Sequence, residues 1–284
     1  MLRRWWQGLQ RRRDDAAVLR RPIPDDLWKR TLIRYPFLQR RDPADATELR
    51  RLTSLFLDRK EFSGAGGLRV TDAMAVTVAA QACLPVLRLG LDNYDGFVGV
   101  VLHPDQVVAQ RESIDESGVV HRYEEVLAGE AVQGGPLMLS WSDVRLGSGA
   151  HAKSGLATPG YNVVLHEFAH VLDMATGAAD GMPALPPELP AALWQRTMGQ
   201  AFEDFLRLLE QAEMHAQDRT AEAAPTALDP YGASGPEEFF AVASEAFFVT
   251  PTELRSAHPA LYALLVRYFQ QDPEMDRPPP GRRP

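Results

Sequence analysis

Cysteine and long apolar runs are the two features that this sequence has least of. Cys83 is the only cysteine among 284 residues, so no disulfide can form within the chain. No uninterrupted apolar run approaches the roughly 20 residues of a membrane-spanning helix. The first residues, MLRRWWQGLQ, contain arginines but no apolar core of a secretory signal. We therefore expect a cytoplasmic protein with no membrane span, in which Cys83 is a buried structural thiol.

An excess of positive charge is also missing. The chain has 30 lysines and arginines against 38 aspartates and glutamates, which gives a formal net charge of −8. A protein that binds nucleic acid directly needs a positive surface for the phosphates, so we expect no direct nucleic-acid partner. The contents of 45% hydrophobic and 24% charged residues are typical of globular domains.

The pattern of apolar residues changes along the chain and predicts an α+β fold. Helical spacing is found over residues 42–60 and again from residue 71 to about residue 85. The middle third contains the short β-type runs GFVGVVLHP, VVAQRE and PLMLSWS, which are typical of strands in a small mixed sheet. The last third is helical again. We expect one mainly helical domain over residues 1–272 with a helical N-terminal part, and a disordered Pro/Arg-rich tail over residues 273–284.

The segment HEFAH at residues 166–170 is the strongest chemical signal. It matches H-E-x-x-H, and the apolar residues on both sides of it predict a buried helix. Histidines four residues apart lie one helical turn apart on one face, so both imidazoles can bind one ion, at distances that suit zinc. Glu167 points about 100° round the helix and can reach a water bound to that ion.

This pattern predicts His166 and His170 as zinc ligands and Glu167 as the general base of amide hydrolysis by a zinc-activated water. The alternative is a chance match of five letters. That alternative would bury polar side chains on an apolar helix without partners, and a metal ion removes the difficulty.

A catalytic zinc ion needs a third protein ligand and an open position. The extended pattern with a glycine and a histidine further along is excluded, because Asp173 and Thr176 occupy those two positions. Glu188 lies downstream in the proline-rich loop MPALPPELP, which makes it a poor candidate.

A better candidate lies in the predicted helix of YGASGPEEFFAVASEAFF. Pro236 suits the first turn of this helix, and Glu238 and Glu245, seven residues apart, share one stripe of it. The other interpretation is that Glu237 and Glu238 only contribute favourable charge at the helix N-terminus. Spacing alone leaves these two interpretations open.

Two segments, NVVLHEFAHVLDM and DPYGASGPEEFFAVASEAFF, resemble the Mlc titration factor A family. These are bacterial zinc metallopeptidases whose catalytic fold is related to that of the anthrax lethal factor protease. The similarity extends with weaker signals across most of residues 20–272. The resemblance implies a zincin-like fold, one zinc ion, and cleavage of short peptides in the manner of an aminopeptidase. It also implies a protein partner, a glucose-responsive transcriptional repressor of the Mlc type.

In that family a tyrosine precedes the glutamate ligand by seven residues, a spacing that Tyr231 and Glu238 reproduce. The resemblance therefore implies Glu238 as the third ligand. It also implies that the Tyr231 phenol hydrogen-bonds the developing oxyanion. The other interpretation of Tyr231 is a loop tyrosine whose hydroxyl is bound to the backbone.

Three further expectations concern the orientation of the ligands, the substrate strand and a rival function. Asp173 and Asn162, one turn beyond His170 and one turn before His166, are candidates to orient the ligands. Residues 136–142 form either the edge strand along which zincin folds pair an extended substrate or an ordinary central strand. The rival to a peptidase is a regulatory protein that sequesters a repressor and keeps its zinc site mainly for structure, and both functions can coexist.

Overall fold

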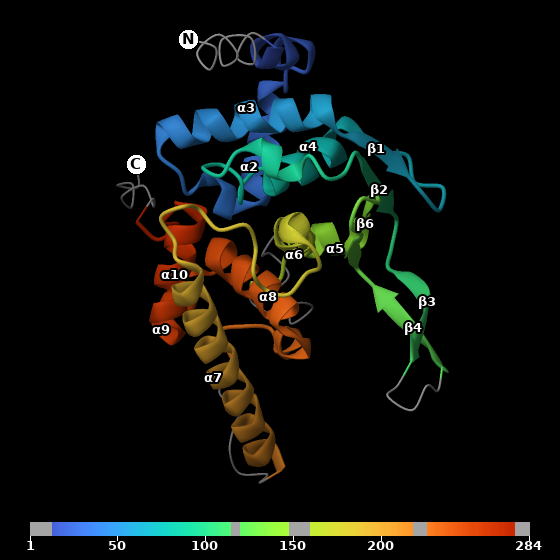
Figure 1. Ribbon diagram of the computed structural model, residues 1–284. Helices are drawn as coiled ribbons and strands as arrows, with labels where there is room; N and C mark the ends of the chain where they lie inside the picture. The colour runs from blue at the N-terminus through green and yellow to red at the C-terminus, as the bar shows by residue number, and fades with distance from the viewer. Residues whose placement is uncertain (1–12, 115–119, 148–159, 218–225, 276–284) are drawn as a thin grey trace.

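The structure is a computed structural model, and it describes residues 13–114, 120–147, 160–217 and 226–275. A small sheet lies at one side of the molecule, on the right in Figure 1, the helices occupy the rest, and α6 lies near the centre. Residues 13–20 are also helical. The remaining helices are α2 (Asp25–Arg34), α3 (Pro43–Arg59), α4 (Asp72–Ala82), α5 (Trp141–Leu146), α6 (Val163–Asp173), α7 (Ala191–Gln217), α8 (Pro236–Val249), α9 (Pro251–Ala257) and α10 (Pro259–Phe269). Short 3₁₀ helices are η1 (Pro36–Gln39), η2 (Leu91–Tyr94), η4 (Met174–Thr176) and η5 (Pro230–Ser234).

The described strands form a four-stranded sheet and a separate hairpin. They are β1 (Glu61–Gly64), β2 (Gly99–His103), β3 (Val107–Ile114), β4 (Val120–Leu127), β5 (Gly129–Ala131) and β6 (Leu137–Ser140). The sheet has the order β1-β2-β6-β5, in which β1, β2 and β6 are parallel and β5 is antiparallel to β6. The prediction of a mainly helical α+β fold with a small mixed sheet is confirmed.

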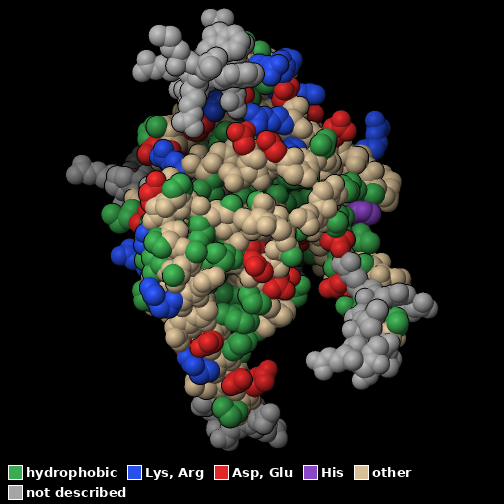
Figure 2. Space-filling model, in the orientation of Figure 1, with side chains coloured by type: hydrophobic (Ala, Val, Ile, Leu, Met, Phe, Trp, Pro, Cys, Tyr) green, Lys and Arg blue, Asp and Glu red, His purple; other side chains and the backbone are tan. Residues whose placement is uncertain are grey.

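Strand β6 lies between β2 and β5, so the central-strand interpretation of residues 136–142 is correct. The edges of the described sheet are β1 and β5. Strands β3 and β4 pair antiparallel and project from the body of the molecule on the same side as α7 (Figure 1). Between these two projections the surface is open, and acidic side chains gather on it (Figure 2).

The two predicted N-terminal helices form where the sequence supplies caps. The Asp42 side chain accepts a hydrogen bond from the Asp45 N–H at the start of α3, and the Thr71 side chain caps α4 in the same way. Both helices agree with their predicted ranges within a few residues. The sequence patterns did not reveal β1, β4 or β5.

An aromatic cluster fixes α6 against the N-terminal half of the chain. The Phe168 ring packs edge-on against Tyr94 at 4.9 Å, Phe56 at 5.7 Å and Phe97 at 5.8 Å between ring centroids. Buried hydrophobic residues from Ala17 to Phe269 belong to one core cluster. Cys83 is fully buried, as the sequence predicted.

Among the described residues, no helix combines the length and the apolar character that crossing a bilayer requires. The boundaries of the single domain stay a prediction. Most of the predicted tail, residues 276–284, lies outside the described residues.

Candidate metal centre

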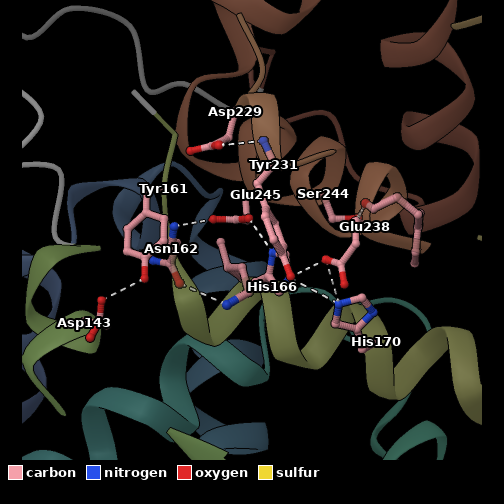
Figure 3. A network of polar contacts seen from close by, with 12 residues as sticks. Asp143, Tyr161, Asn162, His166, His170, Asp229, Tyr231, Glu238, Ser244 and Glu245 are labelled. Carbon is pink, nitrogen blue, oxygen red and sulfur yellow. Dashed lines mark hydrogen bonds and ion pairs between the residues drawn. The ribbon is translucent and has the colours of Figure 1, made fainter. Parts of the chain in front are cut away.

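Helix α6 carries the H-E-x-x-H segment, and its start is well defined. The Asn162 side chain accepts a hydrogen bond from the Leu165 N–H at 2.9 Å and so caps the helix. Val164, Leu165 and Phe168 face the core and are completely buried. The opposite side of the helix presents His166 and His170 to α8 (Figure 3).

Helix α8 brings Glu238 to the two histidines. Pro236 occupies its first turn, as predicted, and Glu238 follows in the same turn. Glu238 Oε2 lies 3.0 Å from His166 Nε2 and 3.3 Å from His170 Nε2, and the two Nε2 atoms are 3.1 Å apart (Figure 3). The structure thus brings together three predicted ligands that lie up to 72 residues apart in the sequence.

These three side chains fit a divalent metal ion. Their ligand atoms all lie within 4.8 Å of one another, and the set of two imidazoles and one carboxylate is one that zinc accepts. Two donors about 2.0–2.1 Å from a tetrahedral ion are about 3.3 Å apart, close to the separation of the two Nε2 atoms. Because three groups that attract positive charge converge on one point, a cation is the ligand this arrangement favours.

The pKa values in this group also favour positive charge. Burial raises the pKa of the Glu238 carboxyl, but hydrogen bonds from His166 and His170 outweigh burial and bring it down to about 2. Burial works against protonation of His166, yet its bonds to Glu238 and Glu245 raise its pKa well above the ordinary value. A bound cation would replace this proton between the same groups.

Glu245 orients His166 from the side away from the other ligands. Its Oε1 accepts a hydrogen bond from His166 Nδ1 at 2.8 Å, which leaves Nε2 directed at Glu238 and His170. A carboxylate behind a ligand histidine fixes the ring and raises its basicity. Glu238 and Glu245 therefore both face His166 from one side of α8, as their spacing predicts, but only Glu238 faces the other candidate ligands.

Asn162 supports this arrangement through its main chain. Its N–H donates to Glu245 Oε2, and its side-chain amide donates to Gln81 Oε1 at 2.7 Å and to the Gly147 carbonyl at 3.1 Å. It therefore acts on the His166 ring through Glu245, while its carbonyl accepts the His166 N–H at 3.0 Å within the helix.

Asp173 holds the other end of α6 and contacts neither histidine by a hydrogen bond within the described chain. Its Oδ2 accepts from the Gly181 N–H at 2.8 Å. The Gly181 carbonyl accepts from Trp194 Nε1 at 2.9 Å, and Gly181 has a φ of 79°. A Cβ there would lie 2.7 Å from the Pro236 carbonyl oxygen, so this glycine lets the loop approach the start of α8.

Glu167 lies against the edge strand β5. A Cβ on Gly129 would be 2.5 Å from Glu167 Oε1, and the main chain of Ala131 hydrogen-bonds the carboxylate. Burial raises the pKa of Glu167 above the usual range, although His166 and His170 oppose this. Sequence reasoning missed the role of β5, because the three residues Gly129–Ala131 carry no strand signal.

Tyr231 reaches the same site from η5 (Figure 3). Asp229 caps this turn by accepting from the Tyr231 N–H at 2.9 Å. The Tyr231 ring centroid lies 5.9 Å from that of His166, and the residue is 51% exposed. In the described chain its hydroxyl has no hydrogen-bond partner. Burial of the hydroxyl, together with the nearby Glu238, raises its pKa to about 12, so the phenol keeps its proton at neutral pH.

Several known proteins are similar in sequence to this chain. The family described as glucose-regulated metallo-peptidase M90 matches residues 6–270. The Mlc titration factor A of Edwardsiella ictaluri is 38% identical over 207 residues, which cover 72% of each chain. That of Klebsiella pneumoniae is 33% identical over 247 residues, 87% of this chain and 86% of its own. That of Serratia proteamaculans is 34% identical over 235 residues, 81% and 83% of the two chains.

Proposed function

Because the chain belongs to the glucose-regulated metallo-peptidase family M90, we propose that it is a zinc-dependent peptidase of zincin-like architecture. His166, His170 and Glu238 would hold one zinc ion. The observation that carries the proposal is the convergence of their three ligand atoms within 4.8 Å. The H-E-x-x-H segment on α6 supports it.

Glu167 would act as the general base. A bound zinc ion supplies Lewis acidity toward a peptide carbonyl and lowers the pKa of water. Glu167 accepts the proton of the attacking water and delivers it to the leaving amine. Its contact with β5 keeps the carboxylate beside the path of a substrate, and its raised pKa brings it closer to neutrality, where proton transfer in both directions is efficient.

Tyr231 would stabilise the charge that develops on the carbonyl oxygen. The residue is half-exposed, its ring lies beside that of His166, and its hydroxyl keeps its proton, so the hydroxyl can donate a hydrogen bond to a substrate. An extended peptide can pair with the free edge of β5 and pass Glu167. We propose short peptides as substrates and aminopeptidase-like cleavage in the cytoplasm.

A second function is favoured by the names of the relatives. Three of them are called Mlc titration factor A. We propose that this chain also binds a repressor of the Mlc type, and that capture does not require hydrolysis. Capture of such a repressor by a Glu167→Gln variant would separate this function from the peptidase. If the zinc site were mainly structural, the Glu167→Gln variant would lose neither its zinc nor its capture of the repressor.

The peptidase is tested by two substitutions that separate base from ligand. Glu167→Gln keeps the size of the side chain but removes the base, so zinc should stay bound while kcat falls by about 10²–10⁴-fold. Glu238→Ala removes a ligand, so zinc content after dialysis should fall as well. Peptide turnover and elemental analysis of both proteins are the measurements. Undiminished turnover in Glu167→Gln would sink the mechanism, and full zinc retention in Glu238→Ala would point to a different third ligand.

A further inference from the structure

An open cavity of about 550 Å³ lies beside Glu167. One wall is the end of β5 and the turn after it, residues 131–135, and the opposite wall is formed by Val171 of α6 and by Met174 and Ala175 of η4. Phe97 and Leu137 also line it, and Ala184 contributes from the loop before α7. This volume is within the range of ligand pockets.

The cavity does not include the proposed ligands or Glu167 among its lining residues, but it adjoins the proposed active site through Ala131. Ala131 hydrogen-bonds the Glu167 carboxylate through its main chain and also lines the cavity. Val171 lies one helical turn beyond Glu167 on α6, and Met174 follows at the start of η4, so the cavity begins one turn beyond the base. Gln133 Nε2 donates to the Gly177 carbonyl at 3.2 Å and connects the two walls.

The cavity offers mainly apolar surface, because its polar side chains already have partners. Asp92 pairs with Arg59 at 3.1 Å, and the Asn93 amide donates to the Leu89 and Gly90 carbonyls at 3.0 Å each. Gln133 makes the bond to Gly177. A charged or strongly polar guest would lose water without gaining a partner there, whereas an apolar guest would bury surface against Val171, Met174 and Phe97.

We propose that this cavity is the subsite for a large apolar side chain of the peptide substrate, at a residue that precedes the scissile bond. The inference rests on the proposed peptidase function and specifies its substrate class. It makes leucine- and phenylalanine-like side chains the preferred ones at that position.

The direction follows from the pairing of the edge strand. Strand β5 runs from Gly129, beside the base, toward the cavity at residues 131–135. A substrate strand antiparallel to β5 runs the opposite way, from the cavity toward Glu167. Its residues at the cavity are therefore N-terminal to the bond that lies at Glu167.

The test uses the full-length, zinc-loaded protein and a set of otherwise identical peptides. Ala, Leu, Phe or Lys is placed at the residue before the cleaved bond, which is the N-terminal residue in aminopeptidase-like cleavage, and at each of the two residues after it, and mass spectrometry identifies the bond. We expect kcat/KM to be about tenfold or more higher for Leu or Phe than for Ala at the preceding residue, and lowest for Lys.

Ala184→Phe fills the cavity from an exposed position and should reduce that preference to within about threefold, well below the discrimination of a fitted pocket. Ala178→Phe, an exposed alanine in the same loop that does not line the cavity, should keep both activity and preference.

The outcomes distinguish a failure of the subsite proposal from a failure of the peptidase function on which it rests. If no peptide is cleaved in a zinc-dependent manner, the peptidase function fails and the subsite with it. If peptides are cleaved but Leu and Phe bring no advantage before the bond, or if the preference lies after it, only the subsite is overturned. Unchanged preference in Ala184→Phe would overturn it as well.

Discussion

The two ends of α6 are held in different ways. At the N-terminal end, the Asn162 N–H donates to Glu245, and Glu245 in turn accepts from His166 Nδ1. The Asn162 side chain also caps α6 and donates to the Gly147 carbonyl. At the C-terminal end, Asp173 uses one oxygen for Gly181, while its buried Oδ1 has no hydrogen-bond partner in the described chain. The open cavity is lined by residues at this C-terminal end of the helix. More polar contacts therefore hold α6 at the end that carries the candidate ligand His166 than at the end beside the proposed substrate cavity.

Among the variants that test this comparison, the largest effect is expected at Gly129 of β5, which faces Glu167 between the two ends of α6. Gly129→Ala would place a Cβ 2.5 Å from Glu167 Oε1 and displace the base without touching a ligand. We expect kcat/KM to fall by roughly 10²-fold with zinc retained, because a misplacement of about 1 Å can cost that much. Steady-state kinetics and zinc analysis measure both quantities.

Two further variants make this prediction specific. At Gly199 a Cβ meets nothing within 4 Å, so Gly199→Ala serves as the matched control and should keep full activity. Glu167→Asp shortens the carboxylate, so combined with Gly129→Ala it should cost less than the product of the two single losses. Strictly multiplicative losses would show that Gly129 does not act through Glu167.

The N-terminal end is tested by Glu245→Gln. The amide keeps the shape but cannot accept from both the His166 Nδ1–H and the Asn162 N–H, because one of its atoms is itself a donor. We expect zinc affinity to fall by about tenfold, as for other partners of ligand histidines. Competition with a chelator measures it. Glu237→Gln, on the same helix turn as Glu238, is the control, and equal affinities in the two variants would refute the role of Glu245.

The smallest effect is expected at the C-terminal end, from the titration of Asp173. Burial raises its pKa from 3.8 to about 6. A raised folded-state pKa stabilises the fold below the unfolded pKa, and this contribution is lost as the pH rises through about 6. Between about pH 4 and pH 6.5 the free energy of unfolding should therefore fall in the wild type relative to Asp173→Asn by on the order of 1 kcal/mol.

Urea unfolding of the metal-free proteins at the two pH values measures this difference. Asp105→Asn, which removes an exposed carboxylate outside α6 and the loop after it, should behave as the wild type. If the free energy of unfolding depended on pH in the same way in the wild type and in Asp173→Asn, the charged form of Asp173 would not destabilise the folded protein.

The sequence was most informative where chemistry is local. The pairing of His166 with His170 follows from one helical turn, and the burial of their helix follows from its apolar neighbours. Glu238 and Glu245 were found on one stripe, but spacing could not separate their roles. The resemblance to the family selected Glu238, and only the packing of α6 against α8 shows that Glu245 meets the other ring nitrogen of His166.

Contacts between distant segments could not be predicted. Nothing in the residues of β5 indicates that it lies beside Glu167, because the contact depends on how β5 joins β6. The expectation that Asp173 orients a ligand histidine was wrong, since helical spacing gave its face but not the Gly181 N–H that its carboxylate accepts.

Gly181 lets metal retention and substrate choice change independently. It fits closely against Pro236, so the turn that carries Glu238 keeps its distance from α6 as long as this residue has no side chain. The loop residues on either side of it, among them Ala184 in the cavity wall, are not restricted in this way. The loop sequence can therefore differ between related chains, and with it the peptides that are accepted, while the position of Glu238 relative to α6 stays the same.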